Sequence, residues 1–298
     1  MADGKLNNGC AVALGNFDGM HIGHLAVLDK TAQLEKEGLT ATVMLFDEHS
    51  LKGVRGEAPP MIMTGEERLR FLEEKGITAT LINFSEIKDL SPEAFVDEIL
   101  IERLNAKAVV CGFNYRFGKN ASGDADTLRA LCDKKGLKCE IVSEVELDGT
   151  QVNSTAIRKT IEKGDISTAN RMLGRSFGFS AEVIDGDKRG RTWGLPTINQ
   201  KLPEGLAVPL FGVYKSAVTV GGKKYMGVTN IGLRPTVGTD IVLSETHILD
   251  FDENLYGEVV DVRLTDFIRP EKKFASFDEL ISQIKSDIST VKGGAKDV

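Results

Sequence analysis

Long hydrophobic runs and an excess of positive charge are both missing from this sequence. No apolar run approaches the roughly 20 residues that a membrane-spanning helix needs. The chain carries 37 Lys and Arg residues against 44 Asp and Glu residues, which gives a formal net charge of -7. This balance disfavours a broad face for nucleic acid, but it permits a local basic pocket for a phosphorylated small molecule. We therefore expect small-molecule partners, and neither nucleic acid nor a membrane.

Cysteine is also scarce, since the chain has 4 cysteines and no Cys-x-x-Cys pair. Free thiols in a reducing compartment fit this pattern best. The amino-terminal stretch MADGKLNNGC lacks the apolar core of a signal peptide. These observations predict a cytoplasmic protein and leave its oligomeric state open.

The first part of the 298-residue chain alternates apolar runs with helical patterns. Strands are expected at residues 10–17, 40–46, 77–84, 106–113 and 137–147, and helices at 24–39, 64–76, 91–104, 124–136, 153–164 and 167–173. Strands that alternate with helices of this length predict right-handed βαβ units. The expected fold is therefore an α/β, doubly wound parallel sheet.

The pattern changes near residues 174–180, after which helical periodicity is almost absent until the end. Residues 212–232 are two β-rich runs around Gly221-Gly222, a hairpin signal. Residues 259–267 alternate apolar and polar side chains, and residues 277–290 form one amphipathic helix. We expect a smaller antiparallel β-barrel domain with a C-terminal helix, and domains at residues 1–178 and 179–298.

Histidine is rare, yet 2 of the 4 histidines stand three residues apart in the stretch ALGNFDGMHIGH. This stretch joins the first expected strand to the first expected helix, and ligands of parallel α/β sheets bind at such strand ends. Glycines there let the backbone approach a nucleotide, and the helix N-terminus suits a phosphate. His21 and His24 would share one helix face and stabilise the charge that grows as pyrophosphate leaves. The predicted nucleotide-binding residues of the turn are Gly15, Asn16, Phe17, Asp18 and Gly19.

Two other interpretations of this stretch are an ordinary turn with surface histidines and a zinc site. A zinc site needs a third ligand, for which His49 is the candidate.

A second group of candidates follows in residues 153–165, which open a helix. Ser154 and Thr155 offer hydroxyl groups and Arg158 offers a guanidinium for phosphate oxygens. The alternative is an ordinary capped helix.

The second half adds a glycine-rich, cationic segment at residues 186–200. It can wrap a polyphosphate, although it lacks the Gly-Lys-Ser/Thr ending of a Walker A loop. The predicted nucleotide-binding residues here are Gly186, Lys188, Gly190 and Arg191. Thr197 and Asn199, two residues apart in an extended segment, would ligate a hydrated Mg²⁺. Glu245 would accept the proton of a hydroxyl that attacks a γ-phosphate; otherwise it is a solvent-facing strand residue.

The G-x-F-D-G-x-H-x-G-H stretch resembles the signature of the nucleotidyltransferase superfamily. Class I aminoacyl-tRNA synthetases share its His-x-Gly-His element, but we find no counterpart here of their lysine-rich second loop. Residues 112–124 and 153–165 resemble segments of the prokaryotic FAD synthetase family. That resemblance implies that Asn114 and Arg116 bind flavin and that the later segment holds the phosphates.

The second half resembles the riboflavin kinase module of the same family. The matching segments are residues 186–199, 212–214, 230–236, 245–251 and 254–257. The resemblance spans essentially the whole chain. It implies an ATP- and Mg²⁺-dependent bifunctional enzyme that phosphorylates riboflavin to FMN and adenylylates FMN to FAD.

The chain departs from the family pattern at several positions. Trp193, Leu195 and Ile198 stand where the family has Leu, Phe and Ala, and added bulk beside a phosphate loop can displace it. The remaining departures are Ala181, Asn153 and residues 45–50. Two alternatives therefore stay open: an adenylyltransferase with an inactive barrel, and a non-catalytic flavin-binding sensor.

Overall fold

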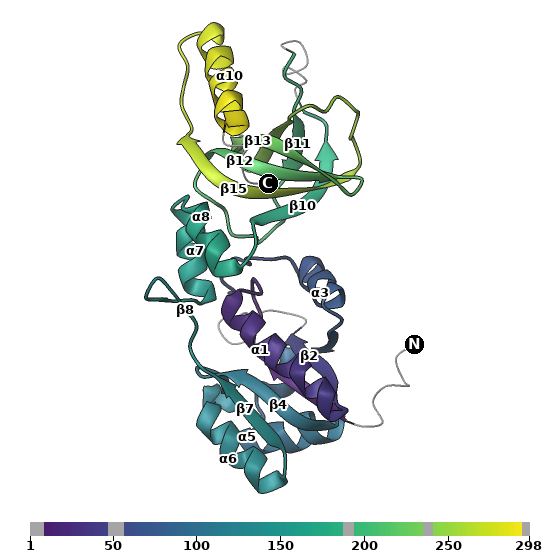
Figure 1. Cartoon of the computed structure of the whole chain (residues 1–298). Coiled ribbons are helices and arrows are strands. Elements are labelled where there is room, and N and C mark those ends of the chain that lie inside the picture. The colour runs from purple at the N-terminus through teal and green to yellow at the C-terminus, as the bar shows by residue number, and fades with distance from the viewer. Residues whose placement is uncertain (1–8, 47–56, 187–193, 235–240, 294–298) are drawn as a thin grey trace. The chain divides into compact units, whose positions relative to one another are not determined.

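The computed structural model describes residues 9–46, 57–186, 194–234 and 241–293, and the chain forms two compact units (Figure 1). The first unit comprises residues 1–59 and 65–154, and the second comprises residues 60–64 and 155–298. This division assigns α8 (Ile166–Leu173) to the second unit, whereas the sequence pattern groups it with the first. The reason is a long-range contact: Asn170 of α8 donates to the carbonyl of Leu264 at 2.9 Å and accepts from the amide of Phe177 at 2.6 Å.

The first unit contains a five-stranded parallel sheet in the order β3-β2-β1-β4-β7. Its strands are β1 (Cys10–Leu14), β2 (Thr40–Phe46), β3 (Thr78–Ile82), β4 (Ala106–Gly112) and β7 (Lys138–Val142). Its main helical elements are α1 (Ile22–Gln33), α3 (Gly65–Glu74), the π-helix η3 (Phe95–Arg103) and α6 (Ala125–Lys135). The predicted doubly wound sheet is confirmed.

The strand β1 is buried on both sides, which explains its continuous apolar run. Cys10, Val12 and Leu14 belong to the hydrophobic cluster that includes η3 and α6. Ala11 and Ala13 point the other way by alternation, and their small side chains let α1 pack closely on the sheet.

Three local details differ from the expected elements. The helix expected at residues 91–104 is a short turn, α5 (Pro92–Ala94), followed by π-helix rather than α-helix. The strand expected to reach residue 84 stops earlier, because Asn83 caps the short helix α4 (Phe84–Ile87) with its side chain. The strand expected at 137–147 also ends early, and β8 (Glu146–Leu147) then pairs with β9 (Thr150–Gln151) around an Asp-Gly turn.

The second unit contains a closed antiparallel barrel, as predicted, in the order β10-β11-β14-β13-β12-β15. Its strands are β10 (Phe177–Ile184), β11 (Ile198–Lys201), β12 (Gly212–Val220), β13 (Lys223–Arg234), β14 (Ile241–Ile248) and β15 (Val259–Pro270). The predicted hairpin joins β12 to β13, with φ angles of 55° at Gly221 and 80° at Gly222.

A row of hydroxyl groups crosses the interior of this barrel. Ser216 Oγ lies 2.7 Å from Thr229 Oγ1, which lies 2.9 Å from Thr246 Oγ1. All three residues are at most 2% exposed. Gly227 makes room for the row, because a Cβ atom there would lie 2.7 Å from Ser216 Oγ.

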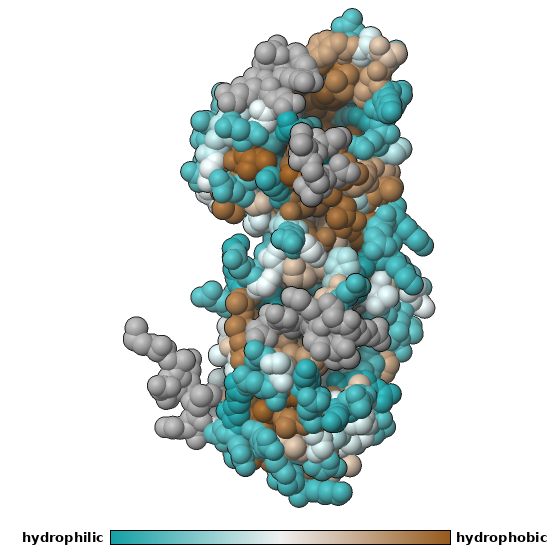
Figure 2. All heavy atoms as spheres, turned by 180° about the vertical axis from the view of Figure 1, so that it is seen from behind, coloured by the Kyte–Doolittle hydropathy of each residue, from teal (hydrophilic) through white to brown (hydrophobic). Residues whose placement is uncertain are grey.

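The C-terminal helix α10 (Phe277–Gly293) packs on the outer face of the barrel. Val291 contacts a cluster with Val213, Val228 and Leu249. Hydrophobic residues form larger groups on the barrel unit than on the sheet unit in the view of Figure 2. None of the helices in the described ranges is long and apolar enough to cross a membrane.

A buried ion pair also fastens α10. Arg269 donates from Nε and Nη2 to the carboxylate of Asp287, at 3.1 and 2.8 Å, and Asp287 is 3% exposed. We expect Asp287→Ala to lower the free energy of unfolding of the barrel unit by about 3 kcal/mol, because Arg269 is left without its charge partner. Thermal unfolding measures this loss. The exposed Ser289→Ala on the same helix is the control, and equal melting temperatures of the two variants would contradict the expectation.

Candidate functional site

The turn after β1 has an unusual backbone. Phe17, Gly19 and Met20 have positive φ angles of 51°, 79° and 41°. Non-glycine residues rarely adopt this conformation, and such strain persists only where the surroundings hold it. The ring of Phe17 packs over Gly15, where a Cβ atom would lie 3.3 Å from Cε2 of Phe17. Phe17 and Met20 are 0% exposed, so they anchor the turn from behind.

The two histidines lie together at the start of α1. Their rings stack with centroids 3.6 Å apart and an angle of 19° between the ring planes. His21 caps the helix, since its Nδ1 accepts a hydrogen bond from the amide of His24 at 3.2 Å. The proton of a neutral His21 ring therefore lies on Nε2, which is a donor. Gly23 permits this fold-back, because a Cβ atom there would lie 3.1 Å from the His21 ring.

A second strand ends beside this turn. Leu14 of β1 is paired with Cys111 of β4, so the segments that follow these strands start next to each other. Phe113 and Asn114 after β4 are exposed, and Oδ1 of Asn114 lies over Gly112. Neighbouring loops at the carboxyl edge of a sheet, where strand order reverses, form the usual ligand crevice of this fold.

Arg116 and Ser154 lie in the same unit as the histidines. Arg116 is exposed and pairs with Asp124, with Nη1 3.6 Å from the carboxylate. Ser154 begins α7 (Ser154–Glu162), and its hydroxyl donates to the carbonyl of Asp18 at 2.9 Å. This hydrogen bond joins Ser154 to the strained turn within the first unit.

The barrel carries its own row of polar side chains on the outer face. Asn199 of β11 is paired with Glu245 of β14, and Glu245 is paired with Asn230 of β13. Directly opposed side chains in antiparallel strands lie about 5 Å apart on one face. Thr197 precedes Asn199 by two residues and lies just before β11. Thr197 and Glu245 are exposed, whereas Asn199 is 6% exposed.

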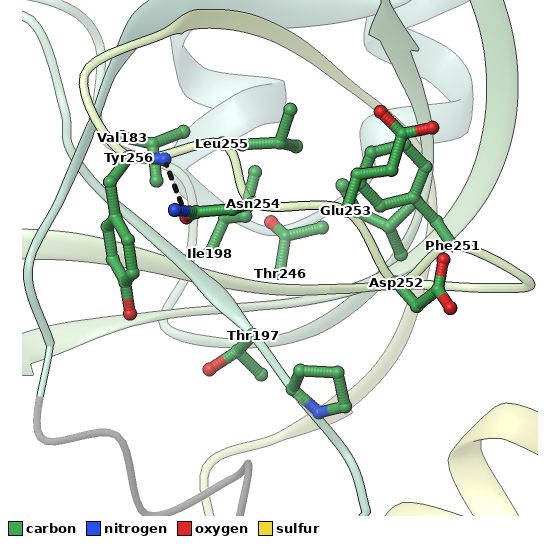
Figure 3. A pocket seen from close by; sticks show the side chains of 12 residues that line it. Val183, Thr197, Ile198, Thr246, Phe251, Asp252, Glu253, Asn254, Leu255 and Tyr256 are labelled. Atoms are coloured by element: carbon green, nitrogen blue, oxygen red, sulfur yellow. Dashed lines mark hydrogen bonds between the residues drawn. The ribbon is translucent and has the colours of Figure 1, made fainter.

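A cavity of about 550 Å³ opens beside Thr197 (Figure 3). It is lined by Val183, Pro196, Thr197, Ile198, Thr246, Ile248 and residues 251–256. Ile198 is paired with Thr246, so its side chain points away from Asn199 and forms part of the cavity wall. Figure 3 shows Tyr256 and Thr197 on the same side of this cavity. The walls are partly apolar, which suits an aromatic ring system.

Gly186 is required next to Asn199. A Cβ atom at Gly186 would lie 2.3 Å from Nδ2 of Asn199, so any side chain there displaces the amide. We expect Gly186→Ala to lower the turnover of a reaction at the barrel by about 10- to 100-fold, because small displacements of a positioning group have effects of this size. A turnover assay of the barrel reaction measures this loss. Gly293→Ala, where a Cβ atom meets nothing within 4 Å, is the control, and equal rates for the two variants would overturn the expectation.

Several predicted site residues lie outside the described residues. These are Lys188, Gly190, Arg191, His49 and Trp193. The residues that the structure does describe include no cluster of three or more His, Cys, Asp or Glu side chains suited to a metal ion.

Comparison with known families matches both halves of the chain. The family model described as FAD synthetase matches residues 3–156, and the model described as riboflavin kinase matches residues 173–293. The bifunctional riboflavin kinase/FMN adenylyltransferase of Haemophilus influenzae is 34% identical over 293 residues, which is 97% of this chain and 95% of that protein. The chain belongs to the bifunctional riboflavin kinase/FMN adenylyltransferase family. The Escherichia coli K12 member is 35% identical over 95% of this chain and 92% of its own length.

A solved structure is similar to this chain over nearly its whole length. A crystal structure described as a macrolide-efflux protein from Streptococcus pneumoniae has a TM-score of 0.88 and 32% identity, and covers 95% of this chain and 94% of its own. The name macrolide-efflux protein describes the Streptococcus pneumoniae protein and is not applied to this chain.

Membership of the riboflavin kinase/FMN adenylyltransferase family confirms the resemblance seen in the sequence. The ring of Phe17 is fully buried behind the turn, and a role of Phe17 in nucleotide binding stays a prediction. Thr155 and Arg158 belong to the second compact unit, where Nε of Arg158 donates to the carbonyl of Pro60 at 2.7 Å. Their contact with phosphates stays a prediction.

The sequence analysis missed two residues beside these sites. Asn230 lies in the row with Glu245, and Arg68 of α3 reaches the turn after β1. The N-I-G segment at 230–232 pointed to Asn230, but no local pattern marks Arg68, because its contact spans 52 residues of sequence.

Proposed function

We propose that this chain phosphorylates riboflavin to FMN in its barrel unit and adenylylates FMN to FAD in its sheet unit, with ATP as the donor in both reactions. Family membership supports both activities. The observation that carries the proposal is the pair of stacked imidazoles at the N-terminus of α1, just after β1 and beside the end of β4.

For adenylyl transfer, a phosphate oxygen of FMN attacks the α-phosphorus of ATP. The new P–O bond forms while the bond to the bridging oxygen of pyrophosphate breaks. His21 donates from Nε2, and His24, one helical turn later, donates to the phosphate charge of the transition state. The phosphate is itself the nucleophile, so no protein base is needed and preorganised donors supply most of the rate. Gly15, Asn16, Phe17, Asp18 and Gly19 shape the nucleotide-binding turn in this proposal, and Ser154, Thr155 and Arg158 bind the phosphates.

The flavin of FMN is placed at the end of β4 in this proposal. Asn114 and Arg116 are exposed there, in the same unit as the histidines. The exposed ring of Phe113 supplies an apolar surface for the flavin.

For phosphoryl transfer, a riboflavin hydroxyl attacks the γ-phosphorus of ATP and ADP leaves. Glu245 accepts the hydroxyl proton, and Gly186, Lys188, Gly190 and Arg191 surround the polyphosphate. The hydroxyl of Thr197 and the amide oxygen of Asn199 are the hard donors that would hold Mg²⁺ in this proposal, which the pairing of Asn199 with Glu245 supports. Bound Mg²⁺ would neutralise phosphate charge.

We further propose that the enzyme acts in the cytoplasm on small molecules and that the two activities divide near residue 178. The supply of ATP and flavin inside cells supports the first point, and the net charge of -7 disfavours a nucleic-acid partner.

The test is incubation with ATP, Mg²⁺ and either riboflavin or FMN, followed by chromatographic separation of the flavins. FAD from both substrates is the expected result. If FAD forms from FMN but not from riboflavin, the chain is an adenylyltransferase with an inactive barrel. If neither substrate gives a product, the chain is a flavin-binding sensor. The first result also shows that Trp193, Leu195 and Ile198 are compatible with kinase activity.

A further inference from the structure

Arg68 joins the ends of two neighbouring strands at the adenylyl-transfer site. Its Nη1 donates to the carbonyl of Asn16 at 3.2 Å, and its Nη2 donates to the carbonyl of Phe46 at 3.4 Å. Leu14 of β1 is paired with Met44 of β2, so Asn16 and Phe46 occupy equivalent positions two residues further on. The planar guanidinium spans this gap with two donors in a fixed geometry.

Arg68 also balances a buried charge in the turn. Asp18 is 5% exposed and interacts electrostatically with Arg68. Burial lowers the pKa of Arg68, and the negative charge of Asp18 raises it in opposition. An uncompensated carboxylate at this position would repel the phosphates of ATP and FMN. The positive charge of Arg68 therefore offsets the negative charge of Asp18 and reduces its repulsion of the phosphates of ATP and FMN.

The strained turn is thus held from two sides. Arg68 holds the carbonyl of Asn16 from α3, and Ser154 of the same unit holds the carbonyl of Asp18. The residues with positive φ angles, Phe17, Gly19 and Met20, follow these two carbonyls, and the turn leads directly into His21. Without one restraint the backbone can relax toward common φ angles and carry the imidazoles with it.

We propose that Arg68 is a positioning residue for adenylyl transfer, which fastens the turn so that His21 and His24 meet the phosphates in a fixed geometry. This inference rests on the proposed function of the sheet unit. Arg68 acts through the turn and does not touch substrate.

The experiment compares Arg68→Gln, Arg68→Lys and Arg70→Gln in the full chain. Arg70 is an exposed arginine on the same helix and serves as the matched control. We expect Arg68→Gln to lower kcat for FAD formation on the order of 100-fold, the effect of a displacement near 1 Å. The KM for ATP changes far less than kcat. Arg68→Lys keeps the charge but not the two-point contact, so its kcat is intermediate, and Arg70→Gln resembles the wild type.

Hydrogen exchange separates positioning from folding. Arg68→Gln should speed exchange of amides in residues 15–21 while β1 and β2 remain protected. Riboflavin phosphorylation in the same samples should be unchanged. If Arg68→Gln loses protection throughout β1 and β2, the sheet itself is disturbed in that variant. The kcat of Arg68→Lys for FAD formation then tests the proposal instead.

Four outcomes would overturn the proposal: equal kcat for Arg68→Gln and Arg70→Gln, a change in KM for ATP alone, unaltered exchange in residues 15–21, or full activity of Arg68→Lys. A wild-type chain that forms no FAD would instead refute the proposed function.

Discussion

The His24→Ala variant is expected to form FAD from FMN and ATP about 10²- to 10³-fold more slowly than the wild type. Removal of one preorganised donor to a developing oxyanion has effects of this size. The substitution also removes one ring of the stacked pair, whose centroids are 3.6 Å apart. Riboflavin phosphorylation should continue at its normal rate, because the histidine lies in the sheet unit. Chromatography of the flavins after separate incubations with riboflavin and FMN measures both rates.

The control for this variant is Asp29→Ala, which truncates an exposed residue of the same helix. Its FAD formation should match the wild type. A normal rate of FAD formation in His24→Ala would show that the imidazole does not act on the transition state.

The Glu245→Gln variant should show the reciprocal result, with riboflavin phosphorylation lowered about 10²- to 10⁴-fold and FAD formation from FMN intact. Glutamine keeps the size of the side chain and its place opposite Asn199, but it cannot accept a proton. The loss therefore reports proton transfer rather than packing. The rate of ADP formation in the presence of riboflavin and ATP measures this loss.

Glu182→Gln is the matched control, because Glu182 is an exposed strand glutamate of the same barrel. If Glu245→Gln phosphorylates riboflavin at the same rate as Glu182→Gln, then Glu245 is an ordinary solvent-facing residue and not the proton acceptor.

The sequence predicts this architecture well where one local signal dominates. The apolar runs of β1, β2 and β4 indicate strands buried on both faces, and the paired glycines at 221–222 indicate a hairpin. The π-helical geometry of η3 has no comparable signal, because side-chain spacing along the chain hardly distinguishes it from α-helix.

The candidate-site residues also fall into two groups, those with a local sequence signal and those without one. The histidine pair and the Thr197–Asn199 pair are local motifs, so spacing alone predicts that their members lie together. Arg68 and the packing of Gly186 on Asn199 depend on residues that are distant in sequence, and neither has a local pattern. Phe17 stands within the motif, but the motif alone does not predict that its ring is fully buried and supports the turn.

The hydroxyl row inside the barrel constrains how this protein can evolve. Replacing Thr229 with valine keeps the volume but deprives both Ser216 and Thr246 of a partner. An apolar replacement of one member is therefore costly, whereas simultaneous replacement of all three and of the buried Ser244, whose hydroxyl lies 3.3 Å from that of Thr246, removes the unsatisfied groups. Sequence change along this row should consequently be correlated, with neighbours on β12, β13 and β14 switching together between polar and apolar side chains.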